Sequence, residues 1–161
     1  MIKPKPNKAF SMDETDRRIL LCFQAEPNLT MVDLADRVGL SHTPCWRRLR
    51  RMEDAGIVRG RALLLDPEKL GYTVNVFAHI KLKSHDEDSL NAFEGAVRVY
   101  SQIVECFSMS GESDYLLRVL ASDVADYERF LKRVLLHLPS VGSVNSSFAL
   151  KKVKLTTDLP L

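Results

Sequence analysis

The 161-residue sequence contains little of what marks a secreted, membrane-bound or zinc-clustered protein. Its three cysteines are few, odd in number and scattered, which argues against both a disulfide framework and a zinc cluster. No apolar run approaches the roughly 20 residues that a membrane helix needs. The basic start MIKPKPNKAF is not followed by the apolar segment of a secretory signal. We therefore expect a cytoplasmic protein with reduced thiols and no membrane partner.

Residue types that serve in catalysis are present, but they do not form a catalytic arrangement. The four histidines are dispersed, and none has the spacing of metal ligands or lies beside a suitable nucleophile. The chain has no G-x-G-x-x-G pattern and no phosphate-binding loop. The acidic run 86–88 lies among polar residues, where a solvated turn is the default. We therefore expect no enzymatic activity, no metal and no cofactor.

Positive charge is concentrated in one short segment, SHTPCWRRLRRMEDAGIVRGR, residues 41–61. The segment holds six arginines against two acidic residues, a net +4 in a chain whose net charge is +2. Residues 1–40 balance six basic against six acidic side chains, and residues 62–161 carry eleven basic and thirteen acidic ones. Such a localised cationic surface fits a solvated helix face, a protein partner or nucleic-acid phosphate.

Three helical patterns fill residues 12–65, after an N-terminal arm, residues 1–11, that we expect to be flexible. The first helix is predicted to start after Asp13, because an apolar stripe with helical spacing follows a residue that caps helices well. Thr30 matches the start of a capping box for a second, shorter helix. Gly39 stands where that helix needs a left-handed C-terminal cap.

A third helix begins at Ser41 or Thr43, both suitable N-cap residues, and extends to Ala55. Helical spacing predicts one buried face: Cys45, Leu49 and Met52. Most of the arginines are predicted on the opposite side, with Arg50 on a flank: Arg47, Arg48 and Arg51. Trp46 borders the apolar stripe, where packing at the edge of the core is the better explanation and base stacking the alternative.

The next segment, IVRGRALLLD, predicts two short extended runs about Gly60, a small β-wing. A short helix, a tight turn, a basic helix and a hairpin form a winged helix-turn-helix, whose second helix enters the major groove with its N-terminal residues nearest the bases. The more distal arginines are better placed for phosphate. The predicted DNA-binding set comprises the cap Ser41, the residues nearest the bases, His42, Thr43, Trp46 and Arg47, and the arginines Arg48, Arg50, Arg51, Arg59 and Arg61.

Residues 66–154 alternate between strand and helix patterns, leaving residues 155–161 as a tail. Strands are predicted at residues 74–82, 102–109, 114–121 and 143–154, and helices at residues 90–97 and 124–138. The order β-α-β-β-α-β predicts a ferredoxin-like domain with both helices on one sheet face, and an α+β fold for the whole chain. Phe77 and Ile80 lie on opposite faces of the first strand, as do Leu116 and Leu117 in the third. Apolar residues on both faces favour a covered sheet, and hence a homodimer.

The run LADRVGLSHTPCWRRLRRMEDAGIVRG resembles the DNA-binding half of the Lrp/AsnC (leucine-responsive/asparagine regulator) transcription factors. Its "TPC-x-RR-x-RR" core followed by "G-I-x-x-G" is a long and specific match, with Trp46 as a departure where an aliphatic residue is common. SGESDYLLRV resembles the "G-x-x-D-Y" signature of the amino-acid-responsive domain in the same family. The resemblance covers about residues 12–154. It implies a domain that dimerises through its sheets, further assembly of dimers into oligomers such as octamers, and small amino-acid effectors bound between subunits near that loop.

The chemistry of this loop agrees with an amino-acid ligand. Gly111 has no Cβ, so backbone N–H groups can approach a carboxylate there. Asp114 or Glu112 can accept a charge-assisted hydrogen bond from an ammonium group. A turn glycine and a strand-edge acid are the better explanations from the residues alone, and the resemblance favours the ligand role. The predicted effector-binding set is Ser110, Gly111, Glu112, Asp114 and Tyr115.

Taken together, the sequence predicts a sequence-specific DNA-binding transcriptional regulator whose activity or assembly is modulated by a small amino acid. The alternative is a detached amino-acid-binding subunit that acts on a protein partner, and the cationic helix favours the regulator. A dimer carries two DNA-binding heads. We therefore expect binding to double-stranded DNA at inverted repeats with half-sites about 10 bp, or a multiple of that, apart.

Overall fold

The computed structural model describes residues 10–161, which form two compact units. One unit contains the chain up to Leu64 together with Lys154–Leu161, and the other contains Leu65–Val153. The tail predicted at residues 155–161 thus belongs to the first unit, where the Gln24 side-chain amide exchanges two hydrogen bonds with the Leu159 backbone, at 2.8 and 3.1 Å. The flexible arm predicted at residues 1–11 lies almost entirely outside the described residues.

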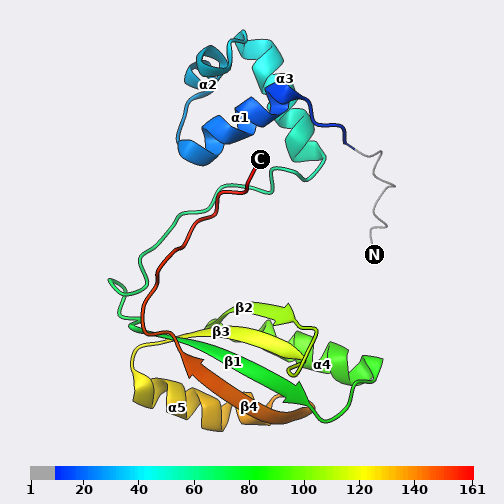
Figure 1. Cartoon of the computed structure of the whole chain (residues 1–161), viewed down its shortest axis with the longest axis vertical. Helices are drawn as coiled ribbons and strands as arrows, with labels where there is room; N and C mark the ends of the chain where they lie inside the picture. Colours follow the sequence, from blue (N-terminus) through cyan, green and yellow to red (C-terminus); the bar gives the residue numbers. More distant parts are fainter. Residues whose placement is uncertain (1–9) are drawn as a thin grey trace. The chain divides into compact units, whose positions relative to one another are not determined.

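Three helices build the first unit: α1 (Glu14–Ala25), α2 (Met31–Val38) and α3 (His42–Asp54) (Figure 1). The caps of the first two helices are as predicted. The side chains of Asp13 and Asp16 each accept the other's backbone N–H, which makes a capping box at the start of α1. Thr30 caps α2, and Gly39 ends it in the left-handed conformation with φ of 69°. Local sequence therefore fixes where these helices begin and end.

The third helix settles the start that the sequence left open between two residues. Ser41 is the extended N-cap residue and α3 begins at His42, although the Ser41 side chain makes no capping hydrogen bond. The helix ends at Asp54, one residue before the predicted end. Its predicted inner face is confirmed, since three side chains are buried in the core of the first unit: Cys45, Leu49 and Met52.

The segment after α3 differs from the prediction. The structure has no paired strands among residues 57–73, so the hairpin predicted about Gly60 does not form within this chain. Leu63, Leu64 and Leu65 are largely exposed, which leaves the segment without an apolar face packed on the unit's core. Two short strands without such packing are marginally stable in water, which is the physical reason for the difference.

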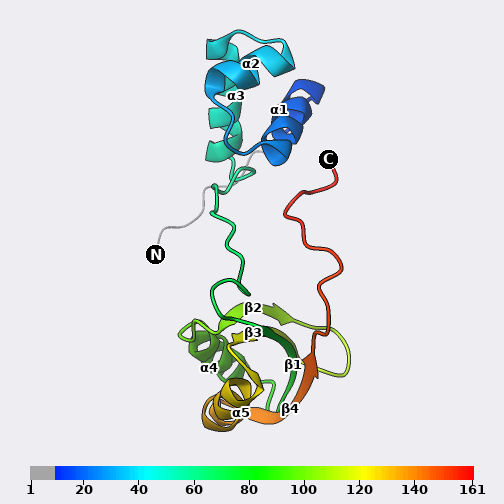
Figure 2. The ribbon, with the colours of Figure 1, turned by 90° about the vertical axis from the view of Figure 1, so that its left-hand side faces the viewer.

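The second unit has the predicted ferredoxin-like order of strands and helices. Its elements are β1 (Val74–Leu82), α4 (Glu87–Val97), β2 (Ile103–Ser108), β3 (Tyr115–Ala121), α5 (Val124–Arg133), the short 3-10 helix η1 (Leu135–His137) and β4 (Val141–Phe148). The four strands form one antiparallel sheet in the order β2-β3-β1-β4. Figure 2 shows α4 and α5 on the same face of this sheet. No helix among residues 10–161 combines the length and apolarity required to cross a membrane.

Two elements in this unit end several residues earlier than predicted. The last strand ends at Phe148 rather than at residue 154, because its antiparallel partner β1 begins at Val74. The Ala149 N–H still bonds to the Asn75 carbonyl, and β1 offers no pairing beyond that point. The last helix ends at Arg133 rather than at residue 138, because Val134 leaves the helical conformation. The chain then turns through η1, which places Leu135 in the core.

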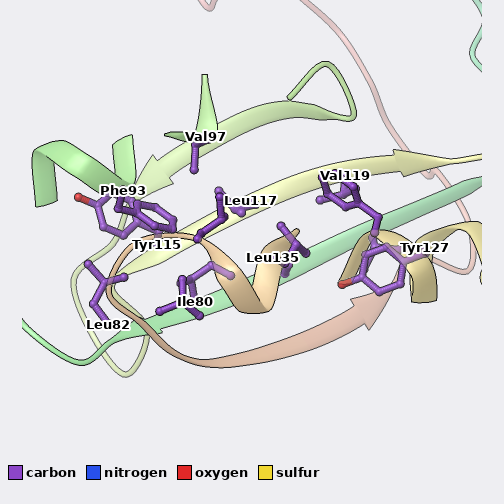
Figure 3. Packing of buried hydrophobic residues seen from close by; sticks show 14 of the residues in the cluster. Ile80, Leu82, Phe93, Val97, Tyr115, Leu117, Val119, Tyr127 and Leu135 are labelled. Carbon is purple, nitrogen blue, oxygen red and sulfur yellow. The ribbon is translucent and has the colours of Figure 1, made fainter. Parts of the chain in front are cut away.

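Alternate residues of β1 and β3 point into a core between the sheet and the helices. On β1, Val76, Ala78, Ile80 and Leu82 are buried, as are the odd-numbered residues of β3 from Tyr115 to Ala121. Phe93 of α4 and Leu135 of η1 pack against them (Figure 3). The strand period of two thus sends one set of side chains into this core and the other to the opposite, helix-free face.

Candidate DNA-binding face and effector loop

The N-terminal half of α3 presents an exposed polar and cationic face. Successive helical residues are rotated by about 100°, so burial of the Cys45 side points Thr43 and Arg47 away from the core of the unit. Ser41, His42, Thr43 and Arg47 are all exposed. This is the part of a helix-turn-helix that lies nearest the bases, and the structure leaves it uncovered by the unit's own residues.

Trp46 is exposed, which contradicts the expectation that it packs at the edge of the core. Its residual exposure is 52%. It lies about 100° around the helix from Cys45, outside the arc that α1 and α2 cover. The sequence pattern placed it next to the apolar stripe, but only the packing of the other helices decides how wide the buried arc is.

The sequence predicted Arg48 and Arg51 on the open face of α3. In the structure both bind carboxylates at the start of α1 instead. Arg48 Nη1 lies 2.9 Å from Asp16 Oδ1 and 2.6 Å from Asp13 Oδ2, and Arg51 Nη2 lies 2.6 Å from Asp16 Oδ2. The Arg51 guanidinium also lies over the Phe10 ring, 4.8 Å from its centroid. These two arginines therefore tie α3 to α1, although about half of the Arg51 side chain remains exposed.

Asp16 is the residue that sequence reasoning missed. Its side chain is fully buried, yet both carboxylate oxygens are hydrogen-bonded. Oδ1 accepts from the Arg48 guanidinium, and Oδ2 accepts from the Arg51 guanidinium and the Asp13 N–H. The only signal in the sequence is the spacing of Asp13 and Asp16 at a helix start. That spacing indicates helix capping and gives no sign of a buried ion pair. The Asp16 N–H, followed by the Arg48 guanidinium, holds the pKa of Asp13 below its usual range.

The remaining arginines of the segment differ in how much of their charge is already paired. Arg50 contacts Glu53 at 3.3 Å and Asp54 at 3.5 Å, and Arg61 lies over the Phe23 ring at 4.8 Å. Arg47 and Arg59 have no carboxylate partner within 4.0 Å among residues 10–161. Arg61 also has no carboxylate partner in that range, so three of the six predicted arginines, Arg47, Arg59 and Arg61, offer unpaired positive charge to a ligand.

The loop between β2 and β3 contains the predicted effector residues. Ser110, Gly111 and Glu112 are exposed, and Gly111 has a φ of 136°, a conformation that side chains with a Cβ rarely adopt. A Cβ built at Gly111 meets no atom of the described chain within 4 Å. The glycine is therefore required by the backbone conformation, and the space beside it is open to a ligand.

Asp114 fastens this loop to the end of β1. Its Oδ2 accepts the Leu82 N–H at 2.7 Å, its Oδ1 lies 2.9 Å from His85 Nε2, and its own N–H donates to the Ile80 carbonyl at 2.9 Å. The Leu82 N–H, assisted by His85, holds the pKa of the Asp114 carboxyl below its ordinary value. The carboxylate predicted to accept an ammonium group is thus already engaged within the chain.

This lowered pKa predicts a stability change with pH. The stabilisation from Asp114 is complete above the unfolded pKa, about 3.9, and is lost as the pH falls through the lower folded pKa. Between pH 5 and pH 2.5 the difference in urea midpoint between the wild type and Asp114→Asn should therefore shrink. Glu112→Gln, an exposed neighbour, is the control and should give no such trend. A difference for Asp114→Asn that is constant with pH would contradict the assignment.

Tyr115 faces the helices, which contradicts its prediction as an effector contact on the loop side. Its ring lies 4.6 Å from that of Phe93, and its hydroxyl donates to Glu94 Oε1 at 2.9 Å. Burial, together with Glu94, raises the pKa of Tyr115 to about 12. Side chains alternate between the two faces along β3, and Tyr115 is the first of the set that points toward the helices. Its side chain therefore lies in the core (Figure 3).

The opposite sheet face carries apolar side chains that the unit's own helices do not cover. Phe77, Leu116 and Leu120 lie there, partly buried, and the pairing of Phe107 with Leu116 places Phe107 beside them. Phe77 and Ile80 were predicted on opposite faces of the sheet, as were Leu116 and Leu117. The complete burial of Ile80 and Leu117 on the helix side confirms this. Arg118 on this face donates to Glu105 at 2.8 Å and to Asn75 at 3.2 Å, so its charge is balanced within the sheet.

Within residues 10–161 no group of three or more histidine, cysteine, aspartate or glutamate side chains is placed to hold a metal ion.

Comparisons with known proteins agree with both units. Residues 12–59 match a family model for winged helix-turn-helix DNA-binding, and residues 75–159 match the model of the Lrp/AsnC ligand binding domain. The DNA-binding transcriptional activator DecR of Escherichia coli is 39% identical over 150 residues, which cover 93% of this chain and 99% of DecR.

Solved structures extend the likeness to three dimensions. The transcriptional regulator NMB0573 of Neisseria meningitidis, in complex with L-Met, is 39% identical, with a TM-score of 0.88 over 93% of this chain and 97% of that one. An AsnC family transcriptional regulator from Agrobacterium tumefaciens is 44% identical, with a TM-score of 0.87 over 92% of this chain and 97% of that one. With its winged helix-turn-helix match, its ligand-binding-domain match and relatives that align along nearly their whole length, this chain belongs to the Lrp/AsnC family of transcriptional regulators.

Proposed function

We propose that this protein is a sequence-specific transcriptional regulator that binds double-stranded DNA through α3 and responds to a small amino acid. The observation that carries the proposal is the exposed start of α3, where His42, Thr43 and Arg47 are uncovered. Unpaired positive charge at Arg47, Arg59 and Arg61 suits phosphate, so Arg47, which the sequence placed nearest the bases, is proposed here as a phosphate contact. The polar side chains at the helix start suit base edges. A detached regulatory subunit would have no use for this face.

The effector is proposed to be a free amino acid bound at the loop between β2 and β3. Support comes from the open space at Gly111, and from the similar regulator NMB0573, which is in complex with L-Met. Backbone N–H groups near Gly111 would bind the carboxylate of the amino acid. The Glu112 side chain, which is exposed and makes no hydrogen bond or ion pair within residues 10–161, would accept from its ammonium group. Asp114, whose two oxygens bind Leu82 and His85, would then act by holding the loop on β1.

The protein is further proposed to work as a homodimer whose subunits pair through their helix-free sheet faces. Apolar side chains on that face, Phe77, Phe107, Leu116 and Leu120, support this, because an uncovered sheet with one apolar face gains free energy by burying it. Two DNA-binding heads would then bind an inverted repeat with much higher avidity than one. Association of dimers into larger rings, such as octamers, is an extension of the same proposal.

The salt dependence of DNA binding tests the assignment of α3. Arg47→Ala is expected to reduce the slope of log affinity against log salt by about 0.9 for each DNA-binding head, because one phosphate contact is lost. The measurement is fluorescence anisotropy, from low to high salt, with an operator selected from random DNA.

Arg17→Ala is the matched control for this measurement. It removes the same charge from an exposed position on a different helix, α1, and should leave the slope unchanged. Equal slopes for the wild type and Arg47→Ala would place the phosphate contact elsewhere. Equal losses from Arg17→Ala and Arg47→Ala would mean that net charge, rather than this face, attracts DNA.

A further inference from the structure

The exposed Trp46 has no structural role among the described residues that accounts for it. It is the only tryptophan in the chain and is 52% exposed on a helix whose other outward residues are polar or charged. His42 lies one turn before it and Arg50 one turn after it on the same side of α3. Single exposed apolar side chains are common on proteins, so exposure alone does not call for a partner. Trp46 differs because it lies on the helix that the proposed function places in the major groove, where contact would bury it and gain free energy.

Charge identifies the partner. The residues that flank Trp46 are cationic or neutral, with Arg47 unpaired beside it and His42 and Thr43 at the helix start. A surface that combines positive charge with one apolar side chain fits the major groove. The edges of the bases there lie between two rows of phosphates, and only thymine contributes an apolar group, its 5-methyl.

We infer that Trp46 contacts the 5-methyl group of a thymine in each half-site and so makes the protein select an A·T pair at that position. The inference rests on the proposed function and adds the base, and the atom on it, that is recognised. Phosphate contacts from Arg47 would set the depth of the helix in the groove, and the indole would then exclude the methyl group from water. No hydrogen bond is needed, since burial of one methyl group supplies the discrimination.

The experiment first selects an operator from random DNA with the wild-type protein and then replaces its thymines by deoxyuridine, one symmetric pair at a time. Deoxyuridine keeps every hydrogen-bonding group and lacks only the methyl. At one pair of positions the affinity of the wild type should fall about four-fold per half-site, the value of one buried methyl. For Trp46→Ala, which should bind the thymine operator about ten-fold more weakly, the same replacement should have no effect.

Two further measurements keep the result interpretable if Trp46→Ala is impaired for other reasons. Leu21→Ala removes a similarly exposed apolar side chain from α1 and should retain the full deoxyuridine effect. The emission of Trp46 reports its surroundings directly, because the chain has no other tryptophan. Emission should change on binding the selected operator, and it should change less with the deoxyuridine form.

The outcomes separate this inference from the proposed function. If the wild type enriches no sequence, the proposed function itself fails. If it enriches an operator but no deoxyuridine position weakens binding, the inference is overturned while sequence-specific binding stands. The inference is also overturned if Trp46→Ala shows the same deoxyuridine loss as the wild type, because another residue then contacts the methyl.

Discussion

Replacing Arg48 and Arg51 together by methionine is expected to lower the unfolding free energy of the first unit by about 3 kcal/mol. Both guanidiniums bind the carboxylate of Asp16, which is fully buried, so the double substitution leaves a buried charge without a counter-ion. Stripping one partner from a buried ion pair costs about 3–5 kcal/mol in proteins, and the lower end applies here because Arg51 is half exposed and its removal admits water.

A third substitution separates the cost of the stranded charge from the loss of the arginines. Adding Asp16→Leu to the double variant should recover most of the stability, because an apolar replacement of a whole buried ion pair is often neutral. Arg47→Met is the matched control, since it removes an arginine from α3 that has no acidic partner in the described chain, and it should change stability by less than about 0.5 kcal/mol. Hydrogen exchange of the α1 and α3 amides in the full chain measures each effect. A double variant as stable as Arg47→Met would show that Asp16 does not depend on the two arginines.

Leu116→Glu is expected to convert the proposed dimer into monomers at micromolar concentration. Leu116 lies on the helix-free sheet face and pairs with His79 on β1 and Phe107 on β2, within the apolar patch. In a two-fold symmetric interface each substitution occurs twice, so two uncompensated carboxylates would have to be buried together. At several kcal/mol for each, the dissociation constant of the dimer should rise by at least about a thousand-fold.

Sedimentation of the full chain measures this effect, and DNA binding provides a second reading. Affinity for an inverted repeat should fall with dimerisation, whereas binding to a single half-site should be unaffected, because only the effective concentration of the second head is lost. Leu136→Glu, at an exposed leucine of η1 in the helical layer, is the matched control and should sediment as the wild type. If both glutamate variants dissociate, the effect is general destabilisation. If neither does, the sheet face is not the interface.

Much of the fold was predictable because it is set by neighbours in the sequence. The caps of α1 and α2 depend on residues three positions apart, and Gly39 supplies a backbone conformation that other residues rarely adopt. Alternation along β1 and β3 fixes which side chains point to the helices, whatever lies beyond the sheet. The order of the elements then leaves few arrangements, and the ferredoxin-like sheet is one of them.

The direction of individual polar side chains was decided by tertiary structure alone. Arg48 and Arg51 are separated from Asp16 by more than 30 residues, so no local pattern indicates that they bind a buried carboxylate instead of solvent. Asp114 likewise bonds to Leu82, 32 residues away, which turns a predicted ligand group into a fastening for its own loop.

The sequence by itself therefore determined the helices, the strands of the sheet, the inner faces and the family, because each depends on short-range periodicity or on a long contiguous motif. It did not determine the wing, whose predicted strands do not form. Only the tertiary structure decided that Trp46 is exposed, that Arg48 and Arg51 pair with Asp16 of α1 and that Tyr115 faces the core. The physical reason is that exposure and pairing depend on which distant elements cover a side chain. That covering is set by the packing of whole helices and sheets, while the spacing of residues along one element only limits the faces available to it.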